Sequence, residues 1–101
     1  MTPEKKVKEK VKKILKELSC YYCMPSTGGY GSSGVPDIIA CYQGRFIGIE
    51  CKANGNKPTD LQQKNLTDIL NSLGQSLVID ENNIDMLKLF IQTNESNINK
   101  N

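Results

Sequence analysis

The chain has 101 residues, with 13 Lys and Arg against 11 Asp and Glu, a formal net charge of +2 and no histidine. This length supports one hydrophobic core and is too short for two, so a single compact domain is expected. A chain without histidine lacks the commonest general base and the commonest zinc ligand. Any catalysis must therefore depend on carboxylates, lysine, thiols or a bound metal ion.

Neither end carries an apolar run long enough for a signal peptide or a membrane span, so we expect a cytoplasmic protein, in its own cell or in a host. Four cysteines without a secretory context favour free thiols over a disulfide framework. The charge is uneven, because residues 1–17 hold seven Lys and three Glu, a local net charge of +4 that leaves −2 for the rest. Two interpretations of this basic segment stay open, a phosphate-binding surface and the solvated face of a helix.

The first predicted element is a helix over residues 3–18. Thr2 and Pro3 are typical of an N-cap and a first helical residue. An apolar stripe at helical spacing follows, made of Val7, Val11, Ile14, Leu15 and Leu18. Residues 19–24 have strand-type side chains, and the Gly- and Ser-rich run after them indicates a long loop.

The centre of the predicted sheet is a hairpin. Two β-rich runs, 37–42 and 45–52, are separated only by Gln43 and Gly44, which indicates antiparallel strands joined by a tight turn.

The second half of the chain predicts a helix, a strand and another helix. The first helix spans 60–73 and is ended by Gly74, a buried strand follows over 75–80, and an amphipathic helix over 82–92. The order α-β-β-β-α-β-α predicts a single α/β domain over residues 1–92 with a mixed central sheet. The polar, Asn-rich residues 93–101 are expected to form a disordered tail.

Charged side chains interrupt the second strand of the hairpin. Alternate side chains of a strand share a face, so Glu50 and Lys52 lie side by side, opposite Ile47 and Ile49. Antiparallel partners meet start to end, which brings Asp37, at the head of the first strand, near the end of the second. We therefore expect Asp37, Glu50 and Lys52 to converge at one end of the sheet.

Two carboxylates at the edge of an apolar sheet are costly unless a cation neutralises them. Magnesium prefers oxygen ligands and keeps several waters, so Asp37, Glu50 and the backbone carbonyl of Cys51 suit it and leave room for a phosphate oxygen. Such a site has the components for phosphodiester hydrolysis, with Lys52 stabilising the charge of the transition state. The structural alternative is that Asp37 caps a turn after Pro36, and that Glu50 and Lys52 form an ordinary surface pair.

The segments GVPDIIA and GRFIGIECKANGNKPTDLQQ resemble the PD-(D/E)xK nuclease superfamily, and within it the VRR-NUC domains of phages and of replication and repair proteins. Gly-Val-Pro-Asp, Ile-Glu-x-Lys and Lys-Pro-Thr-x-x-Gln together are far more specific than E-x-K alone. The resemblance is strongest over residues 34–63 and extends into TPEKKVK and GYGSSG.

This resemblance implies a restriction-endonuclease-like core and a metal-dependent nuclease, often one that acts on branched, flapped or Holliday-junction DNA. It implies that Asp37 and Glu50 hold Mg²⁺ or Mn²⁺ and that Lys52 completes the E-x-K motif. It also implies a site glutamate on the first helix, either Glu4 or Glu9, of which Glu4 fits the motif better.

Further candidates carry alternatives. Gln62 matches the glutamine that the family places at the start of the next helix, but Thr59-x-x-Gln62 also has the spacing of a capping box, and the residue can serve both roles. Lys57 and Arg45 are candidate phosphate contacts, with solvated surface charge as the alternative. Tyr30 is a candidate for stacking on an unpaired base, with a flexible linker as the alternative.

Two other functions stay open at this point. The first is a structural nucleic-acid-binding module with a four-thiolate zinc site, whose candidate ligands are Cys20, Cys23, Cys41 and Cys51. The strand phase argues against it, because it places Cys51 on the apolar side of the sheet. A catalytically inert DNA-binding homologue is the second alternative, against which the complete set of Asp37, Glu50 and Lys52 argues. Because symmetrical cutting of a junction requires two active sites, we expect a homodimer that binds branched DNA.

Overall fold

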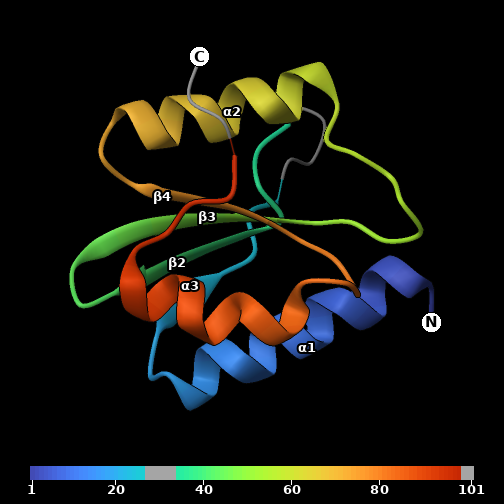
Figure 1. Ribbon diagram of the computed structural model, residues 1–101, viewed down its shortest axis with the longest axis horizontal. Coiled ribbons are helices and arrows are strands. Elements are labelled where there is room, and N and C mark those ends of the chain that lie inside the picture. Colours follow the sequence, from blue (N-terminus) through green and yellow to red (C-terminus); the bar gives the residue numbers. More distant parts are fainter. Residues whose placement is uncertain (27–33, 99–101) are drawn as a thin grey trace.

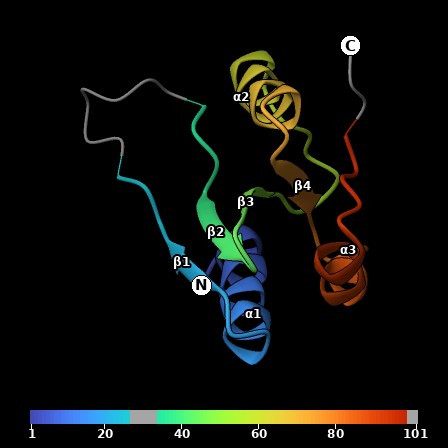
Figure 2. The ribbon, with the colours of Figure 1, turned by 90° about the vertical axis from the view of Figure 1, so that its left-hand side faces the viewer.

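A four-stranded sheet lies between helices in the part of the chain that the structure describes, residues 1–26 and 34–98 of a computed structural model. The elements are α1 (Pro3–Glu17), β1 (Tyr21–Cys23), β2 (Ile38–Tyr42), β3 (Arg45–Cys51), α2 (Asp60–Asn71), β4 (Gln75–Ile79), a 3-10 turn (Ile84–Met86) and α3 (Leu87–Thr93). α1 and α3 cover one face of the sheet and α2 lies on the other (Figure 1; Figure 2). None of the described helices is long and apolar enough to cross a membrane.

The strands lie in the order β1-β2-β3-β4. β1 pairs with β2 and β2 with β3 in the antiparallel sense, whereas β3 and β4 are parallel and α2 forms the crossover between them. The predicted α/β class with a mixed sheet is confirmed, and the arrangement is compatible with a restriction-endonuclease-like fold. The 3-10 turn before α3 was not anticipated.

α1 and α3 pack on the sheet through one apolar core. α1 begins at Pro3 as predicted, where the backbone amide of Lys5 donates to the Thr2 hydroxyl at 3.2 Å, and it ends one residue before the predicted end. Thr2 thereby satisfies one of the free amides of the first turn. The core on this face includes Val7, Val11, Leu15, Ile38, Ala40, Ile47, Ile49, Leu77, Ile79, Leu87 and Ile91.

The β2–β3 hairpin forms as predicted and holds the centre of the sheet. Gln43 (φ 50°) and Gly44 (φ 84°) are both left-handed, the combination that a two-residue type I′ turn requires. The register pairs Ile38 with Ile49. Asp37, which precedes β2, therefore lies beside the end of β3, where the charged residues of that strand are found.

The end of α2 differs from the prediction, because the helix stops at Asn71 and Gly74 is not its left-handed residue. Leu73 takes that conformation (φ 70°), and the amides of Leu73 and Gly74 donate back to Leu70 and Ile69 at 3.1 and 2.9 Å. These two bonds make a Schellman motif with leucine in the position that glycine usually occupies. Gly74 is required for space instead, since a Cβ there would lie 2.8 Å from Cγ2 of Ile69.

Residues 94–98 belong to the segment that we expected to be a disordered tail. Ser96 and Asn97 lie along the outer edge of β4, where the Ser76 amide donates to Ser96 Oγ at 3.0 Å and the Asn97 amide donates to the Ser76 carbonyl at 3.3 Å. The Asn97 side chain also exchanges two hydrogen bonds with the backbone of Val78, each 2.8 Å long. This part of the segment is therefore held on the sheet, and residues 99–101 lie outside the described residues.

Candidate active site

The two carboxylates of the hairpin meet at the C-terminal end of β3. Ile47, Ile49 and Cys51 point into the core beneath α1 and α3, as the strand phase predicted. Gly48, on the other face, lies against α2, because a Cβ there would be 2.6 Å from Cδ1 of Ile69. Glu50 shares that second face by the alternation of the strand. The site therefore lies at the C-terminal end of β3, between the layer of α1 and α3 on one face of the sheet and α2 on the other.

Asp37 is held from two sides. Its Oδ2 accepts a hydrogen bond from the backbone amide of Cys51 at 2.9 Å, and its Oδ1 lies 3.5 Å from Lys8 Nζ on α1. The Asp37 and Lys8 side chains are only 21% and 24% exposed. The neighbouring strand and the first helix together fix this carboxylate, and the hydrogen bond that the structure gives it crosses the sheet, in contrast to the turn cap of the structural alternative.

Glu50 is almost completely buried, with 2% of its surface exposed. Burial, and next the charge of Asp37, raise the pKa of Glu50 to about 7, while the Lys52 ammonium acts in the opposite direction. Oε2 lies 3.6 Å from Lys52 Nζ, and Oε1 has no hydrogen-bond partner among the described residues. A buried carboxylate oxygen without a partner is costly, which marks Glu50 as a residue prepared for a ligand.

Lys52 completes the cluster from the residue after β3. Its backbone amide donates to the Ile79 carbonyl at 2.9 Å, which continues the parallel pairing with β4, and its side chain is 12% exposed. The cluster thus contains two carboxylate–ammonium pairs, Asp37 with Lys8 and Glu50 with Lys52. The structure brings together the three residues that the hairpin register predicted and adds a fourth.

Residues 5–78, which include all of this cluster, match the family model described as archaeal Holliday junction resolvase (Hjc). The match spans well over half of the chain. The chain belongs to the Hjc family. Family membership confirms the expected PD-(D/E)xK type of nuclease, while the closer resemblance to VRR-NUC domains of phages stays a prediction. No curated protein matches the chain at a significant level.

The two candidate acids on α1 of this Hjc-family chain differ in their surroundings, and the choice of Glu4 as the site acid stays a prediction. Glu4 is partly buried one turn before Lys8, so both lie on the side of α1 that faces Asp37. Burial is the main cause that raises the pKa of the Cys51 thiol, followed by the charges of Asp37 and Glu50, and the Glu4 charge adds a smaller contribution. Glu9 accepts instead from Lys12 at 2.9 Å on the exposed side of the helix.

Lys8 was not anticipated from the sequence. Its spacing of four residues from Glu4 was the available signal, since residues four apart share one side of a helix. Among seven lysines in the first 17 residues, the sequence does not say which one turns inward.

Gln62 forms the capping box. Its Oε1 accepts from the Thr59 amide at 2.9 Å, and its own amide donates to the Thr59 hydroxyl at 3.2 Å. The side-chain contact that the structure gives Gln62 is thus to the start of α2, and a role at the metal remains a prediction.

Arg45 is partly buried and forms hydrogen bonds within the protein, so it is not a freely solvated charge, while a contact with phosphate stays a prediction. It lies at the opposite end of β3, where its guanidinium donates to the Gln75 side chain and, at 2.9 Å, to the Ile91 carbonyl. Gln75 in turn donates to the carbonyls of Phe90 and Glu95 at 2.8 and 3.0 Å. This network fixes α3 and the chain after it to the sheet.

The other two predicted DNA contacts lie apart from this network. Lys57 is exposed and lines a groove of about 460 Å³ with Pro58, Asp60 and Asp80 at the start of α2. The groove also borders Val78, the cross-strand partner of Glu50. Tyr30 lies outside the described residues.

The cysteines do not support the zinc alternative. Cys51 is fully buried in the core under α1, whereas Cys23 and Cys41 are exposed. Cys23 pairs with Ile39 and Cys41 with Phe46, so both lie on the opposite face of the sheet from Cys51. All four thiols are free, as the sequence predicted.

The divalent metal on which Hjc resolvases generally depend fits the residues present. Asp37 and Glu50 supply hard oxygen donors, and the unpartnered Oε1 of Glu50 is the kind of atom that a cation satisfies. Within residues 1–26 and 34–98, no group of three or more His, Cys, Asp or Glu side chains gathers to enclose an ion. Magnesium commonly takes only one or two protein carboxylates and completes its shell with water and substrate phosphate. The Cys51 carbonyl stays a predicted third ligand.

Proposed function

We propose that this protein is a metal-dependent DNA endonuclease that hydrolyses phosphodiester bonds in branched DNA, with the four-way Holliday junction as the preferred substrate. The observation that carries the proposal is the buried, unpartnered carboxylate oxygen of Glu50 beside Asp37 and Lys52, in a chain of the Hjc family. The restriction-endonuclease-like core and a cytoplasmic location, in the host if a phage encodes the chain, belong to the same proposal.

In this proposal Asp37, Glu50 and the Cys51 carbonyl hold Mg²⁺ or Mn²⁺. The bound metal would activate a water nucleophile and neutralise charge on the phosphate. Hydrolysis would form one bond from the water oxygen to phosphorus and break one bond from phosphorus to a deoxyribose oxygen; the water gives up a proton, and the deoxyribose oxygen takes one up and leaves as an alcohol. Lys52, whose ammonium is 3.6 Å from Glu50, is placed to stabilise the negative charge that builds on the phosphoryl oxygens.

The remaining residues act around this centre. Glu4 faces the same side of α1 as Lys8 and is proposed to complete the acidic set. Gln62 keeps the capping box at the start of α2 and is proposed to reach the site when DNA is bound. Lys57 and the exposed lysines of α1, which are Lys5, Lys6, Lys10, Lys13 and Lys16, are proposed to contact phosphates on either side of the scissile bond, because such contacts position DNA without reading its sequence.

A homodimer is part of the proposal, because resolving a junction requires two cuts related by symmetry. Tyr21, Cys41 and Phe46 are successive cross-strand partners, so they form one row across β1, β2 and β3 on the α2 face of the sheet. α2 does not cover this row, since Tyr21 is 78% and Phe46 49% exposed. The row is the candidate interface.

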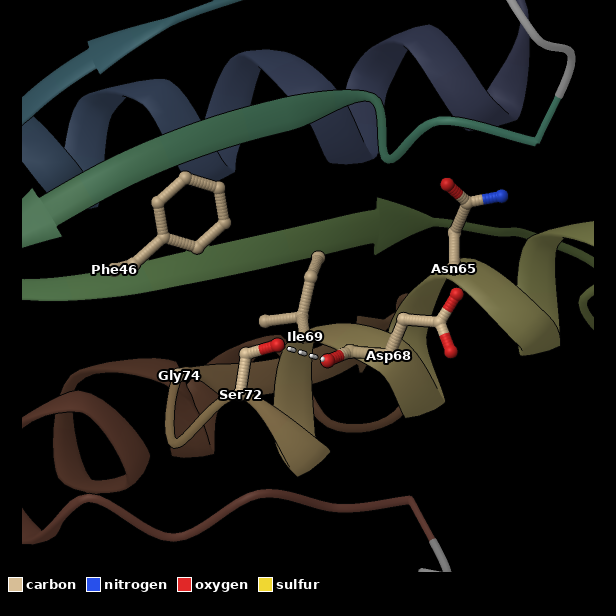
Figure 3. A pocket seen from close by; sticks show the side chains of 6 residues that line it. All are labelled: Phe46, Asn65, Asp68, Ile69, Ser72 and Gly74. Carbon is tan, nitrogen blue, oxygen red and sulfur yellow. Dashed lines mark hydrogen bonds between the residues drawn. The ribbon is translucent and has the colours of Figure 1, made fainter.

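A pocket of about 360 Å³ continues this surface between Phe46 and α2 (Figure 3). Its floor is apolar, with Phe46 and Ile69, while the Ser72 hydroxyl at its rim donates to the Asp68 carbonyl at 2.8 Å. Phe46→Glu would place a charge at the centre of a dimer interface. We expect sedimentation analysis to show a dimer for the wild type and a monomer for Phe46→Glu; a variant that remains dimeric would show that the interface lies elsewhere.

The central experiment compares wild type, Lys52→Ala and Lys64→Ala on labelled linear, nicked, flapped and four-way-junction DNA. Lys64 pairs with Asp68 on the outside of α2, so its substitution makes the same change of charge away from the site. We expect wild type and Lys64→Ala to cut the junction with Mg²⁺ or Mn²⁺, and Lys52→Ala to lose roughly a hundredfold or more in rate. Cutting by Lys52→Ala at the wild-type rate, or cutting that survives a chelator, would overturn the proposal.

A further inference from the structure

A second lysine, outside the E-x-K motif, contacts the Asp37 carboxylate. Lys8 Nζ reaches Asp37 Oδ1 from α1 at 3.5 Å, and both side chains are about three-quarters buried, with 24% and 21% exposed. Lys12, one turn further along the same helix, is 26% exposed and so about as buried as Lys8, but it pairs with Glu9 at 2.9 Å instead. Of these two lysines, only Lys8 is directed at a residue of the candidate site.

The Lys8–Asp37 pair is loose. Its 3.5 Å separation exceeds the roughly 2.7–2.9 Å of a tight charge-assisted hydrogen bond, as does the 3.6 Å separation between Lys52 and Glu50. Oδ2, the other carboxylate oxygen of Asp37, accepts a hydrogen bond from the Cys51 amide, and this bond does not involve Lys8. Lys8 can therefore leave Asp37 without releasing the carboxylate from its place.

The charges of the cluster show what would move Lys8. Asp37 and Glu50 are matched by Lys8 and Lys52, so the four side chains are neutral together when both acids are ionised. A divalent cation on Asp37 would compete with the Lys8 ammonium for the same oxygen and repel it at short range. The anion that enters the site with the metal is a DNA phosphate, and a long, flexible lysine side chain at the edge of the site can turn to it.

We propose that Lys8 is a second cationic residue of the active centre, which holds Asp37 while no metal is bound and turns to the phosphate of bound DNA when the metal takes Asp37. The inference rests on the proposed nuclease function. It gives Lys8 two effects of opposite sign, since the same side chain opposes metal binding in the absence of DNA and assists cleavage in its presence.

The test measures both effects on Lys8→Met, Lys8→Arg and the matched control Lys12→Met. Calorimetric titration of the DNA-free protein with Mn²⁺ is expected to show an affinity about threefold to tenfold higher for Lys8→Met than for wild type, because a largely buried competitor has been removed. Cleavage of a four-way junction at saturating Mn²⁺ is expected to fall about tenfold or more in Lys8→Met and to be largely retained in Lys8→Arg. Lys12→Met should change neither quantity by more than about twofold.

The outcomes separate the two proposals. If the wild type neither binds Mn²⁺ nor cuts DNA, the nuclease function fails and the role of Lys8 fails with it. If the wild type does both, and Lys8→Met has unchanged Mn²⁺ affinity and an unchanged cleavage rate, the role of Lys8 is overturned while the nuclease function stands. A gain in Mn²⁺ affinity with a loss of cleavage supports the inference, and partial unfolding does not imitate it, because a disrupted site would bind metal less tightly.

Discussion

The backbone amide of Cys51 donates a hydrogen bond to the carboxylate of Asp37 at 2.9 Å. One side chain therefore joins the start of β2 to the end of β3 and, in our proposal, also binds the metal. We expect Asp37→Asn to keep an acceptor for this amide, whereas Asp37→Ala leaves a largely buried N–H unpaired and is less stable than Asp37→Asn by about 1–2 kcal/mol.

Both Asp37 variants are expected to lose junction cleavage, because neither supplies a charged ligand. Urea unfolding and a cleavage assay on the same preparations check the two effects separately. Wild-type cleavage by Asp37→Asn would remove Asp37 from the metal site while leaving its structural role intact.

We predict that the raised pKa of Glu50 makes the stability of the metal-free protein depend on pH in an unusual way. Its pKa is raised to about 7 in the folded state, so the folded protein binds this proton more tightly than the unfolded chain does. The stability contributed by the protonated form is fully present below the unfolded pKa of about 4.3 and is lost as pH rises through about 7. The expected loss is on the order of 2–4 kcal/mol.

Glu50→Gln keeps the shape of the side chain and removes its titration. Urea unfolding in chelator between pH 5 and 8 should therefore show a declining free energy of unfolding for the wild type and a flatter profile for Glu50→Gln. The two proteins should be close in stability at the acid end and differ most at pH 8. Parallel profiles would show that Glu50 does not titrate in this range.

Arg45 is expected to matter for stability and not for cleavage. Its guanidinium bonds to Gln75 and to the Ile91 carbonyl, and Arg45→Met would leave both acceptors without this donor. We expect a loss of about 2–3 kcal/mol in the free energy of unfolding, since hydrogen bonds to a charged group are among the stronger ones. Lys88→Met, which removes an exposed pair with Glu17, is the control and should cost far less.

Junction cleavage by Arg45→Met, measured well below its unfolding temperature, should match that of the wild type. A large fall in cleavage by folded Arg45→Met would instead assign Arg45 to the DNA-binding surface.

Leu73 offers a substitution that stabilises the fold. Its backbone is left-handed at φ 70°, a conformation that is strained for leucine, and its side chain is 86% exposed. The strain is therefore not offset by burial of the side chain. Leu73→Gly is expected to raise the free energy of unfolding by about 0.5–1 kcal/mol, the strain released less the added entropy of the unfolded chain. Thermal unfolding checks this, with Lys64→Gly, at an exposed position in the interior of α2, as a control that should destabilise.

The hairpin and its charged residues could be predicted because their signals are local. Gln43 and Gly44 between two alternating runs define the turn, and the turn fixes the register that places Asp37 beside Glu50. The alternation of β3 then assigns Glu50 and Cys51 to opposite faces. Family resemblance added the identity of the chemistry, which geometry alone leaves open.

The remaining features depend on contacts between distant segments. Lys8 and Asp37 are 29 positions apart, and Arg45 and Ile91 are 46 apart, so no local pattern reveals either contact. Gly74 was correctly placed near a helix end, but the left-handed residue is Leu73, because the helix stops two residues earlier than its apolar stripe suggested. The packing of distant segments determines which group a lysine or arginine side chain contacts. The spacing of apolar residues along the sequence does not predict such contacts.

The chain after α3 also determines how the sheet ends. Ser96 and Asn97 bond to the outer edge of β4, so the amides of Ser76 and Val78 are already occupied on that side. An edge with occupied amides cannot template an added strand from another molecule. Shortening the chain to Thr93 would expose this edge, and the truncated protein would then tend to self-associate through β4 and aggregate on heating.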